Sequence, residues 1–271
     1  MLSLRLAAEW PVENVAVAVV GPGGEVLGTH GDQTRSFALA SVTKMLTAYA
    51  VLIAVEEGAV ELEEPAGPEG STVRHLLAHA SGLAMSEDRL QAQPGTRRIY
   101  SNQGFEVLAE HVQQASGIPF NAYLAEAVFG PLRMDDSVLK GSPAHAGTST
   151  ADDLTRFAAE LLAPTLVSRQ LFTEATTVVF PGLAGVLPGF GHQRPNDWGL
   201  GFSVRDHKSP HWTGTANSPE TFGHFGQAGT FLWVDPTVNI ACVALTDRMF
   251  GPWAAEAWPV LSDAVLAEVT S

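Results

Sequence analysis

The segment Asn14-Val-Ala-Val-Ala-Val-Val-Gly-Pro-Gly-Gly-Glu-Val-Leu-Gly-Thr29 is typical of a β-hairpin, with a buried strand, a glycine-rich turn and a returning strand. A second hairpin is predicted near the other end of the chain, where the apolar runs 229–234 and 239–245 flank Asp235-Pro-Thr-Val238. Directly connected strands of this kind pair antiparallel. We therefore expect one antiparallel sheet built from both ends of the chain.

The middle of the chain is predicted to be mainly helical. Apolar residues recur with a helical period in the segments 42–57, 72–79, 103–116, 119–128 and 151–162, and again near the end in 253–268. Ser71 and Thr150 are candidate N-caps. The stretch 180–227 is rich in Gly and Pro, with one expected strand at 200–204, and loops that long are often functional. The expected fold class is α/β of the α+β type, an antiparallel sheet flanked by helices with a helical insertion lobe.

Composition supports one compact unit. The 271 residues are 45% hydrophobic and 16% charged, so the chain can bury a core and does not resemble a disordered protein. We expect a single domain of two lobes, a sheet lobe of residues 1–40 and 191–271 and a mainly helical lobe of residues 41–190. The lone cysteine, Cys242, lies in an apolar run and is expected to be a buried, unreactive thiol.

Charge and the N-terminal segment limit the partners and the location. Lys and Arg number 15 against 29 Asp and Glu, a net charge of −14, which argues against nucleic acid and anionic membranes as partners. The first residues have no continuous apolar core, and Glu9 interrupts them, so no secretory signal is predicted. The run 36–55 is long and apolar enough to suggest a membrane span, but Lys44 near its middle favours a buried helix. The expectation is a cytoplasmic protein with a small-molecule substrate.

Ser41-Val-Thr-Lys44 places a serine and a lysine three positions apart at the start of that helix. Side chains at i and i+3 share a helix face, and the positive end of the helix dipole favours an oxyanion there. Lys44 is the only charged residue within 36–55, and a buried lysine is either paired or loses its proton, in which case it can act as a base toward serine. The alternative is an N-cap serine and a lysine that reaches the surface. A second S-x-x-K, at 137–140, lies in a short segment where no pocket is predicted.

Two further motifs follow in order, Tyr100-Ser-Asn102 ahead of an apolar helix and Gly223-His-Phe-Gly-Gln-Ala-Gly229 leading into a strand. With Ser41-Val-Thr-Lys44 in front of them, the sequence resembles the penicillin-recognising serine hydrolases, in the branch of class C β-lactamases, D-alanyl-D-alanine carboxypeptidases and related esterases. The flanking sequences are similar too, among them His75-Leu-Leu-Ala-His-Ala-Ser-Gly-Leu83, Gly130-Pro-Leu-Arg-Met134 and Leu232-Trp-Val-Asp-Pro236. The resemblance covers about residues 14–250.

The resemblance implies a β-lactamase-like, transpeptidase-like fold and acyl transfer through an acyl-enzyme on Ser41, without a metal or other cofactor. It implies that Tyr100 is the general base, as a phenolate stabilised by Lys44. An ordinary tyrosine has a pKa of about 10, so such a base needs positive charge nearby. Asn102 would orient the lysine and bind the substrate.

The third motif is expected to supply the remaining binding groups. The backbone N–H groups of Ser41 and Gln227 would form the oxyanion hole. Gly226 would let the strand come close to the substrate. Both roles are implied by the resemblance alone.

The same motif also departs from the family's pattern, because His224 and Phe225 stand where relatives carry Lys and Thr or Ser. In the relatives that lysine and hydroxyl help to bind a substrate carboxylate, whereas histidine is mostly neutral near pH 7 and phenylalanine offers no hydrogen bond. We therefore expect esterase-like hydrolysis of small esters or amides, with β-lactamase or D-amino-acid peptidase activity as the alternative. A second H-x-G, at 145–147, lies in a loop and is expected to be outside the site. The oligomeric state is left open.

Two rival classes remain. His75 and His79 have the i, i+4 spacing of a zinc pair, but Leu76 follows where H-E-x-x-H has its glutamate, so we expect structural histidines. A non-hydrolytic acyl-binding or sensor domain on the same fold would be acylated without turnover. The presence of Tyr100 and Asn102 argues against such an inactive site.

Overall fold

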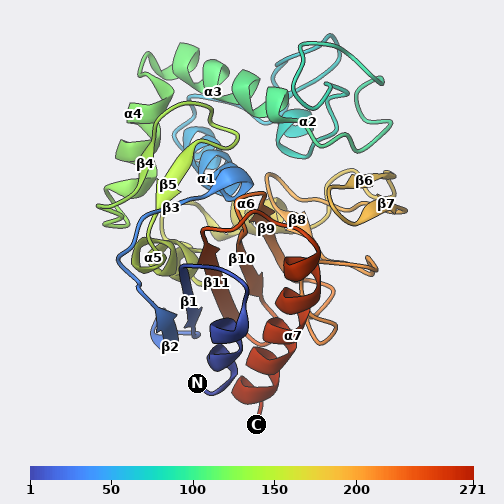
Figure 1. Cartoon of the computed structure of the whole chain (residues 1–271). Coiled ribbons are helices and arrows are strands. Elements are labelled where there is room, and N and C mark those ends of the chain that lie inside the picture. The colour runs from blue at the N-terminus through green and yellow to red at the C-terminus, as the bar shows by residue number, and fades with distance from the viewer.

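The computed structural model describes residues 1–271, and its centre is a six-stranded sheet of order β2-β1-β11-β10-β9-β8 (Figure 1). Its strands are β1 (Val15–Val20), β2 (Val26–Gly31), β8 (Ser203–Val204), β9 (Phe222–Gly226), β10 (Thr230–Asp235) and β11 (Ile240–Thr246). All neighbours pair antiparallel, and β1 pairs with β11, so the hairpins from the two ends of the chain meet inside one sheet. The predicted α+β fold with an antiparallel sheet from both termini is confirmed.

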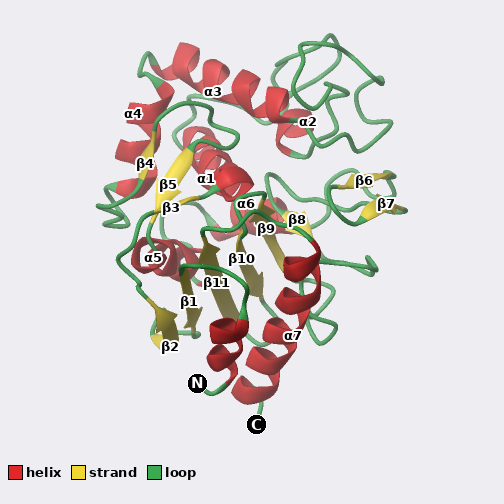
Figure 2. Cartoon of the chain, in the orientation of Figure 1, coloured by secondary structure: helices red, strands yellow, loops and turns green.

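Helices cover both faces of the sheet and form a second layer beyond its end (Figures 1 and 2). They are α1 (Thr43–Glu56), α2 (Val73–Leu77), α3 (Asn102–Ser116), α4 (Phe120–Leu124), α5 (Ala151–Leu162), α6 (Arg169–Thr176) and α7 (Pro252–Val269), with the helical turns η1 (Ser3–Glu9), η2 (Ala40–Val42) and η3 (Ala125–Phe129). Short strands complete the fold: β3 (Phe37–Ala38), β4 (Val138–Leu139) and β5 (Gly147–Ser149) form a small sheet, and β6 (Gly185–Leu187) and β7 (Gly191–Gln193) form a hairpin.

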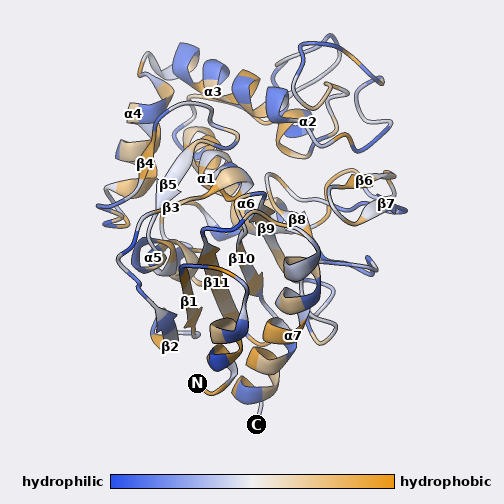
Figure 3. Ribbon diagram, viewed as in Figure 1, coloured by the Kyte–Doolittle hydropathy of each residue, from blue (hydrophilic) through white to orange (hydrophobic).

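The central strands divide two hydrophobic cores. Side chains of a strand alternate between the two faces of a sheet. Accordingly Val17 and Val19 of β1 join a core with η1 and α7, whereas Ala16 and Val20 join the larger core with α1 and α5. Figure 3 shows the central strands β1, β10 and β11 as hydrophobic and the outward turns of α3 as hydrophilic. The apolar face of α3 packs against α1 and α2, which places the first residue of α3, Asn102, beside the start of α1.

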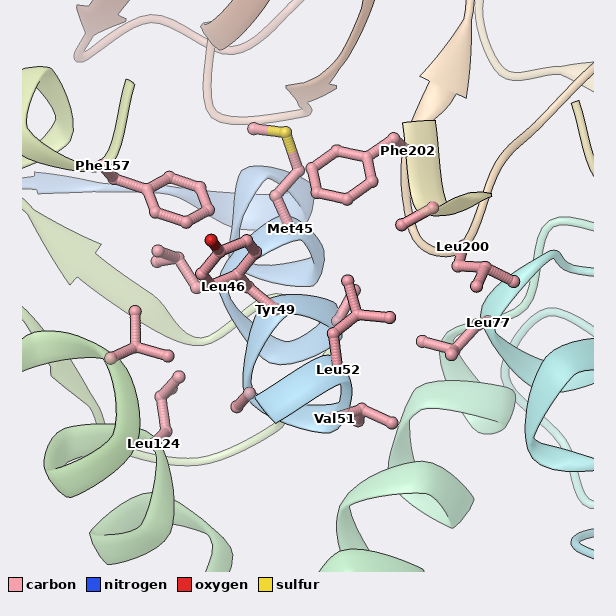
Figure 4. Packing of buried hydrophobic residues seen from close by; sticks show 14 of the residues in the cluster. Met45, Leu46, Tyr49, Val51, Leu52, Leu77, Leu124, Phe157, Leu200 and Phe202 are labelled. Carbon is pink, nitrogen blue, oxygen red and sulfur yellow. The ribbon is translucent and has the colours of Figure 1, made fainter. Parts of the chain in front are cut away.

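Helix α1 is the centre of the larger core, and its residues 43–54 are all buried. In Figure 4 side chains from several other segments pack around it, among them Leu77, Leu124, Phe157, Leu200 and Phe202. A helix that is apolar on every side is buried within a protein or a membrane. Here the protein itself buries it, and no helix of the chain combines the length and the apolar character that crossing a membrane requires.

The predicted helix caps and segment boundaries agree with the structure only in part. Thr150 caps α5 by accepting from the N–H of Asp153, as expected, but the Ser71 cap is wrong: Thr72 is the N-cap residue of α2 and makes no side-chain cap bond. The expected helix 119–128 continues from α4 into a π-helical turn, and the expected strand 200–204 is reduced to Ser203–Val204. Turn η1 and helix α6 were not predicted. The lobe boundaries remain a prediction.

Candidate active site

Ser41 lies in the short turn η2 that leads into α1, and strand β9 packs directly against this turn. Ala40 has a positive φ of 45°, and the carbonyl of Leu39 accepts a 2.8 Å hydrogen bond from Thr230 Oγ1. A Cβ added to Gly226 would lie 2.3 Å from that carbonyl oxygen, so only glycine lets strand and turn approach this closely. Gly226 was expected to let the strand come close to the substrate. In the structure it lets β9 come close to the backbone just before Ser41.

Lys44 is fully buried and points toward the same place. Its Nζ donates to Asn102 Oδ1 at 2.6 Å and to the carbonyl of Ala144 at 2.9 Å, and lies 3.5 Å from Ser41 Oγ. It makes no ion pair. Burial lowers the pKa of Lys44 to about 7, with the charge of Glu106 acting in the opposite direction, so the neutral amine is well populated near pH 7.

Tyr100 is buried beside this pair. Lys44 Nζ lies 4.7 Å from the centre of its ring. Burial raises the pKa of Tyr100 well above its usual range, and hydrogen bonding to Ser41 offsets this only in part. The resting site therefore holds a phenol and a readily deprotonated lysine. This ordering of pKa values is opposite to the one that a resting Tyr100 phenolate would need.

His224 faces Tyr100 from strand β9. Its Nδ1 lies 2.6 Å from the carbonyl oxygen of Phe225, so Nδ1 carries the proton and Nε2 is left as an acceptor, 3.5 Å from the Tyr100 hydroxyl. Burial, together with the nearby charge of Lys44, lowers the pKa of His224 to about 3, although the hydrogen bond to the Phe225 carbonyl acts in the opposite direction. The residue that stands where relatives have a lysine is thus a neutral acceptor for Tyr100.

Gln227 follows the last residue of β9 and makes two hydrogen bonds with the backbone of Phe250. The N–H of Phe250 donates to the carbonyl of Gln227 at 2.9 Å, and Gln227 Nε2 donates back at 3.4 Å. The backbone N–H of Gln227 itself has no acceptor within the protein. It is therefore a free donor at the rim of the site.

These groups open into a cavity of about 330 Å³. Its lining residues are Ala40, Ser41, Met85, Tyr100, Asn102, His145, Leu187, Pro188, Trp198, Ser203, Trp212, His224, Phe225 and Gln227. None of them is an aspartate, glutamate, lysine or arginine. Apolar and aromatic side chains alternate with a few polar groups, a composition common in pockets for small organic ligands.

About half of this lining was not identified from the sequence. Met85, Pro188, Trp198 and Trp212 come from loops, whereas Leu187 ends β6 and Ser203 begins β8. For those within 180–227 the only signal was the Gly and Pro content of that stretch. His145 belongs to the second H-x-G motif, which was expected to lie outside the site, and that expectation is wrong.

Arg98 is a further residue that sequence patterns did not reveal. Its guanidinium is buried and donates to four backbone carbonyls, those of Ala78, Val179, Phe180 and Asn196. These carbonyls belong to three separate segments. Arg98 thereby ties the segment before Tyr100 to the loop that carries Trp198.

The other motifs are placed elsewhere or serve other contacts. Ser137 bonds Ser149 and Asp153 and does not line the cavity. His75 Nδ1 bonds Thr72 Oγ1 at 2.9 Å, whereas His79 Nδ1 accepts from the N–H of Ser101 at 3.1 Å. No group of three or more His, Cys, Asp or Glu side chains is arranged to hold a metal. Cys242 is buried in β11, and burial raises the pKa of its thiol.

Known proteins share this sequence and fold. The family model described as Beta-lactamase matches residues 8–266. A crystal structure of a β-lactamase from Mycobacterium bovis is 61% identical and superposes with a TM-score of 0.98, over 99% of this chain and 100% of that one. The simvastatin synthase of Aspergillus terreus shares the fold, with a TM-score of 0.81 at 16% identity over 98% of this chain and 96% of that one.

Among curated proteins, a D-alanyl-D-alanine-carboxypeptidase/endopeptidase of Escherichia coli is 27% identical over 142 residues, which cover 39% of this chain and 37% of that protein. The chain spans between about a third and just over half of the length of the curated relatives that it matches. The family match, by contrast, runs almost from one end of this chain to the other. The chain belongs to the β-lactamase family of penicillin-recognising serine hydrolases.

Proposed function

We propose that this protein hydrolyses small, uncharged esters or amides through an acyl-enzyme on Ser41. The observation that carries this proposal is the absence of any Asp, Glu, Lys or Arg among the cavity-lining residues, together with a neutral His224. A carboxylate that entered this cavity would lose its hydration without gaining a fixed cation, which is costly. A neutral acyl group bears no such cost.

In the acylation step Lys44 is the base. Its neutral amine takes the proton of the Ser41 hydroxyl, 3.5 Å away, as Oγ bonds to the substrate carbonyl carbon. When the bond to the leaving group breaks, the Tyr100 hydroxyl gives that group a proton. The step ends with an acyl-Ser41, an ammonium on Lys44 and a phenolate on Tyr100.

Deacylation reverses these transfers. The Tyr100 phenolate, now beside a charged Lys44, takes a proton from water, and the resulting hydroxide attacks the acyl carbon. The ammonium of Lys44 returns its proton to Ser41 Oγ as the acid leaves. In this proposal Tyr100 is the base in the second half of the reaction, at the moment when the charge that stabilises its phenolate is present.

The negative charge that develops on the carbonyl oxygen needs donors that are already in place. The free N–H of Gln227 and the N–H of Ser41 are proposed to form this oxyanion hole. Loss of one such donor typically costs about 10² to 10³ in rate. Asn102 holds the lysine at 2.6 Å and lines the cavity, which suits contact with the substrate as well.

The first test is a fluorophosphonate probe followed by intact-mass measurement and peptide mapping. A single adduct on Ser41, absent in Ser41→Ala, supports an activated serine. Turnover of short-chain nitrophenyl esters then tests hydrolysis, with a chromogenic β-lactam as the charged comparison. A folded protein without an adduct would refute the proposal.

β-Lactamase or D-amino-acid peptidase activity is the second candidate. It is favoured by the names of the Mycobacterium bovis structure and the Escherichia coli relative. Faster turnover of the β-lactam, or of a peptide ending in D-alanine, than of any neutral ester would establish it. A single labelling event without turnover would instead indicate an acyl-binding domain. Cell fractionation would test the cytoplasmic location, which is part of this proposal.

A further inference from the structure

A chain of hydrogen bonds links the surface side of α3 to the amine of Lys44. Glu106, one turn after Asn102 in α3, accepts a hydrogen bond from the hydroxyl of Ser142. The same hydroxyl oxygen accepts from the N–H of Ala144 at 3.1 Å, and the carbonyl of Ala144 accepts from Lys44 Nζ at 2.9 Å. Glu106 therefore holds Ser142 in the loop of residues 142–147, and the Ala144 carbonyl of this loop is one of the acceptors of Lys44.

Apart from the link to Glu106, residues 142–147 are held mainly by α1. The N–H of Gly147 donates to Thr43 Oγ1 at 3.0 Å. Thr47 of α1 donates to the carbonyl of Pro143 at 2.7 Å, and the N–H of Ala146 closes a turn onto the carbonyl of Ser142 at 2.9 Å. His145, which follows Ala144, is exposed and lines the cavity. The position of the loop thus affects both the lysine and the cavity wall.

The electrostatic surroundings of Lys44 also indicate a role for Glu106. Lys44 has no carboxylate within ion-pair distance, and Glu106 is the only acid whose field favours its charged form. The other groups that face Lys44 are His79 and Tyr100 from the segments packed on α3 and His224 from β9, and burial keeps all three uncharged. In the resting site Glu106 is therefore the source of negative charge that acts on the Lys44 amine. The Tyr100 phenolate of the proposed function arises only after the leaving group has taken its proton.

We propose that Glu106 is a positioning residue for Lys44: through Ser142 it fixes the Ala144 carbonyl on Nζ, and its carboxylate balances the ammonium that forms during acylation. This inference rests on the proposed function, in which Lys44 gains a proton from Ser41. It adds a residue outside the three motifs, on a part of α3 that does not touch the cavity.

The test can be made without catalysis, because the chain has only three lysines, Lys44, Lys140 and Lys208. Protein labelled with ¹³C at lysine Cε gives three signals, assigned by Lys44→Met and Lys140→Arg. We expect Glu106→Gln, which keeps an acceptor for Ser142 but removes the charge, to lower the titration midpoint of Lys44. Glu110→Gln, one turn further along α3 on an exposed side chain, is the matched control and leaves it unchanged. An unchanged or higher midpoint in Glu106→Gln overturns the proposal.

Kinetics give the second measurement. In Glu106→Gln the acid limb of the kcat/KM profile moves to lower pH by the same amount as the NMR midpoint, with little change in KM. Ser142→Ala keeps the charge and breaks the link, and we expect a lower kcat with a smaller midpoint shift. Wild-type kcat in Ser142→Ala would overturn the positioning role. Failure of the proposed function would look different. The wild-type protein would hydrolyse none of the substrates, yet Glu106→Gln would still lower the titration midpoint of Lys44 relative to the wild type.

Discussion

The Tyr100 hydroxyl lies 3.5 Å from Nε2 of His224, and the histidine is the acceptor because its Nδ1–H is engaged with the carbonyl of Phe225. A lysine at this position could only donate, so it could hold a substrate carboxylate but could not accept from a protonated tyrosine. The histidine at position 224 of the third motif thus changes both the charge of the cavity and the partner of Tyr100.

We predict that His224→Lys shifts substrate preference toward anions. The ratio of kcat/KM for a chromogenic β-lactam to that for a neutral nitrophenyl ester should rise about tenfold or more, the scale of a hydrogen bond to a charged group. His224→Gln, which stays neutral, is the control and should leave the ratio near that of the wild type. Equal ratios in all three proteins would mean that His224 does not set the charge preference.

The pH dependence of activity should follow Lys44. Since its pKa is about 7 and the neutral amine is the active form, kcat/KM should rise with pH through a midpoint near 7 and then level off. His224, with a pKa of about 3, contributes nothing to this limb. A pH–rate profile with a neutral ester measures it, and a flat profile between pH 5 and 8 would contradict the assignment of Lys44 as base.

Tyr100→Phe should lose about 10²-fold to 10⁴-fold in turnover, the usual contribution of a positioned acid or base. With a nitrophenyl ester, whose leaving group departs without taking a proton, deacylation should suffer most because Tyr100 is proposed to activate the water, and acyl-Ser41 should accumulate. Intact-mass spectrometry after mixing with substrate detects the acyl-enzyme. Full activity across the pH range would show that the hydroxyl has no part in proton transfer.

Gly226→Ala should impair the site and the fold together. The new methyl group would meet the carbonyl oxygen of Leu39 at 2.3 Å and push away the turn that carries Ser41. Overpacking of this kind costs about 1–3 kcal/mol of stability. Thermal unfolding gives the stability, and the rate of fluorophosphonate labelling gives the reactivity of Ser41. Gly251→Ala is the control for loss of a glycine, because Gly251, like Gly226, has no positive φ and an added Cβ there meets only Trp253 Cδ1, at 3.9 Å.

Burial of Lys44 should also make the free energy of unfolding depend on pH. The folded pKa of Lys44 is about 7 and its ordinary value is 10.5, so between these values the unfolded chain binds the extra proton. The free energy of unfolding contributed by this group therefore rises as pH increases from about 7 to about 10.5. Denaturant unfolding of wild type and Lys44→Met at several pH values should show the gap between them changing in that direction. A constant gap would mean that Lys44 titrates normally in the folded state.

The residues with a motif were predictable, and those without one were not. Ser41 and Lys44 were singled out by their spacing, and Tyr100 and Asn102 by the family resemblance of the three motifs in order. The structure brings all four together. Trp198 and Trp212 were not identified, because cavity walls made by loops depend on long-range contacts such as those of Arg98, which leave no periodic pattern. The protonation of Tyr100 also depends on burial by residues distant in sequence. The sheet was predictable because strand periodicity and short turns are local signals.

The burial of α1 on every side has a consequence for dynamics. A helix at the centre of the core exchanges its amide protons only when most of the protein opens, so the lysine and serine at its start are held by the most slowly exchanging part of the chain. The cavity is also lined by residues outside this core, such as the exposed loop residue Met85. Amide exchange should accordingly separate a protected α1 from more rapidly exchanging loops, so that under the proposed function substrate range can change through the loops while Ser41 and Lys44 stay in place.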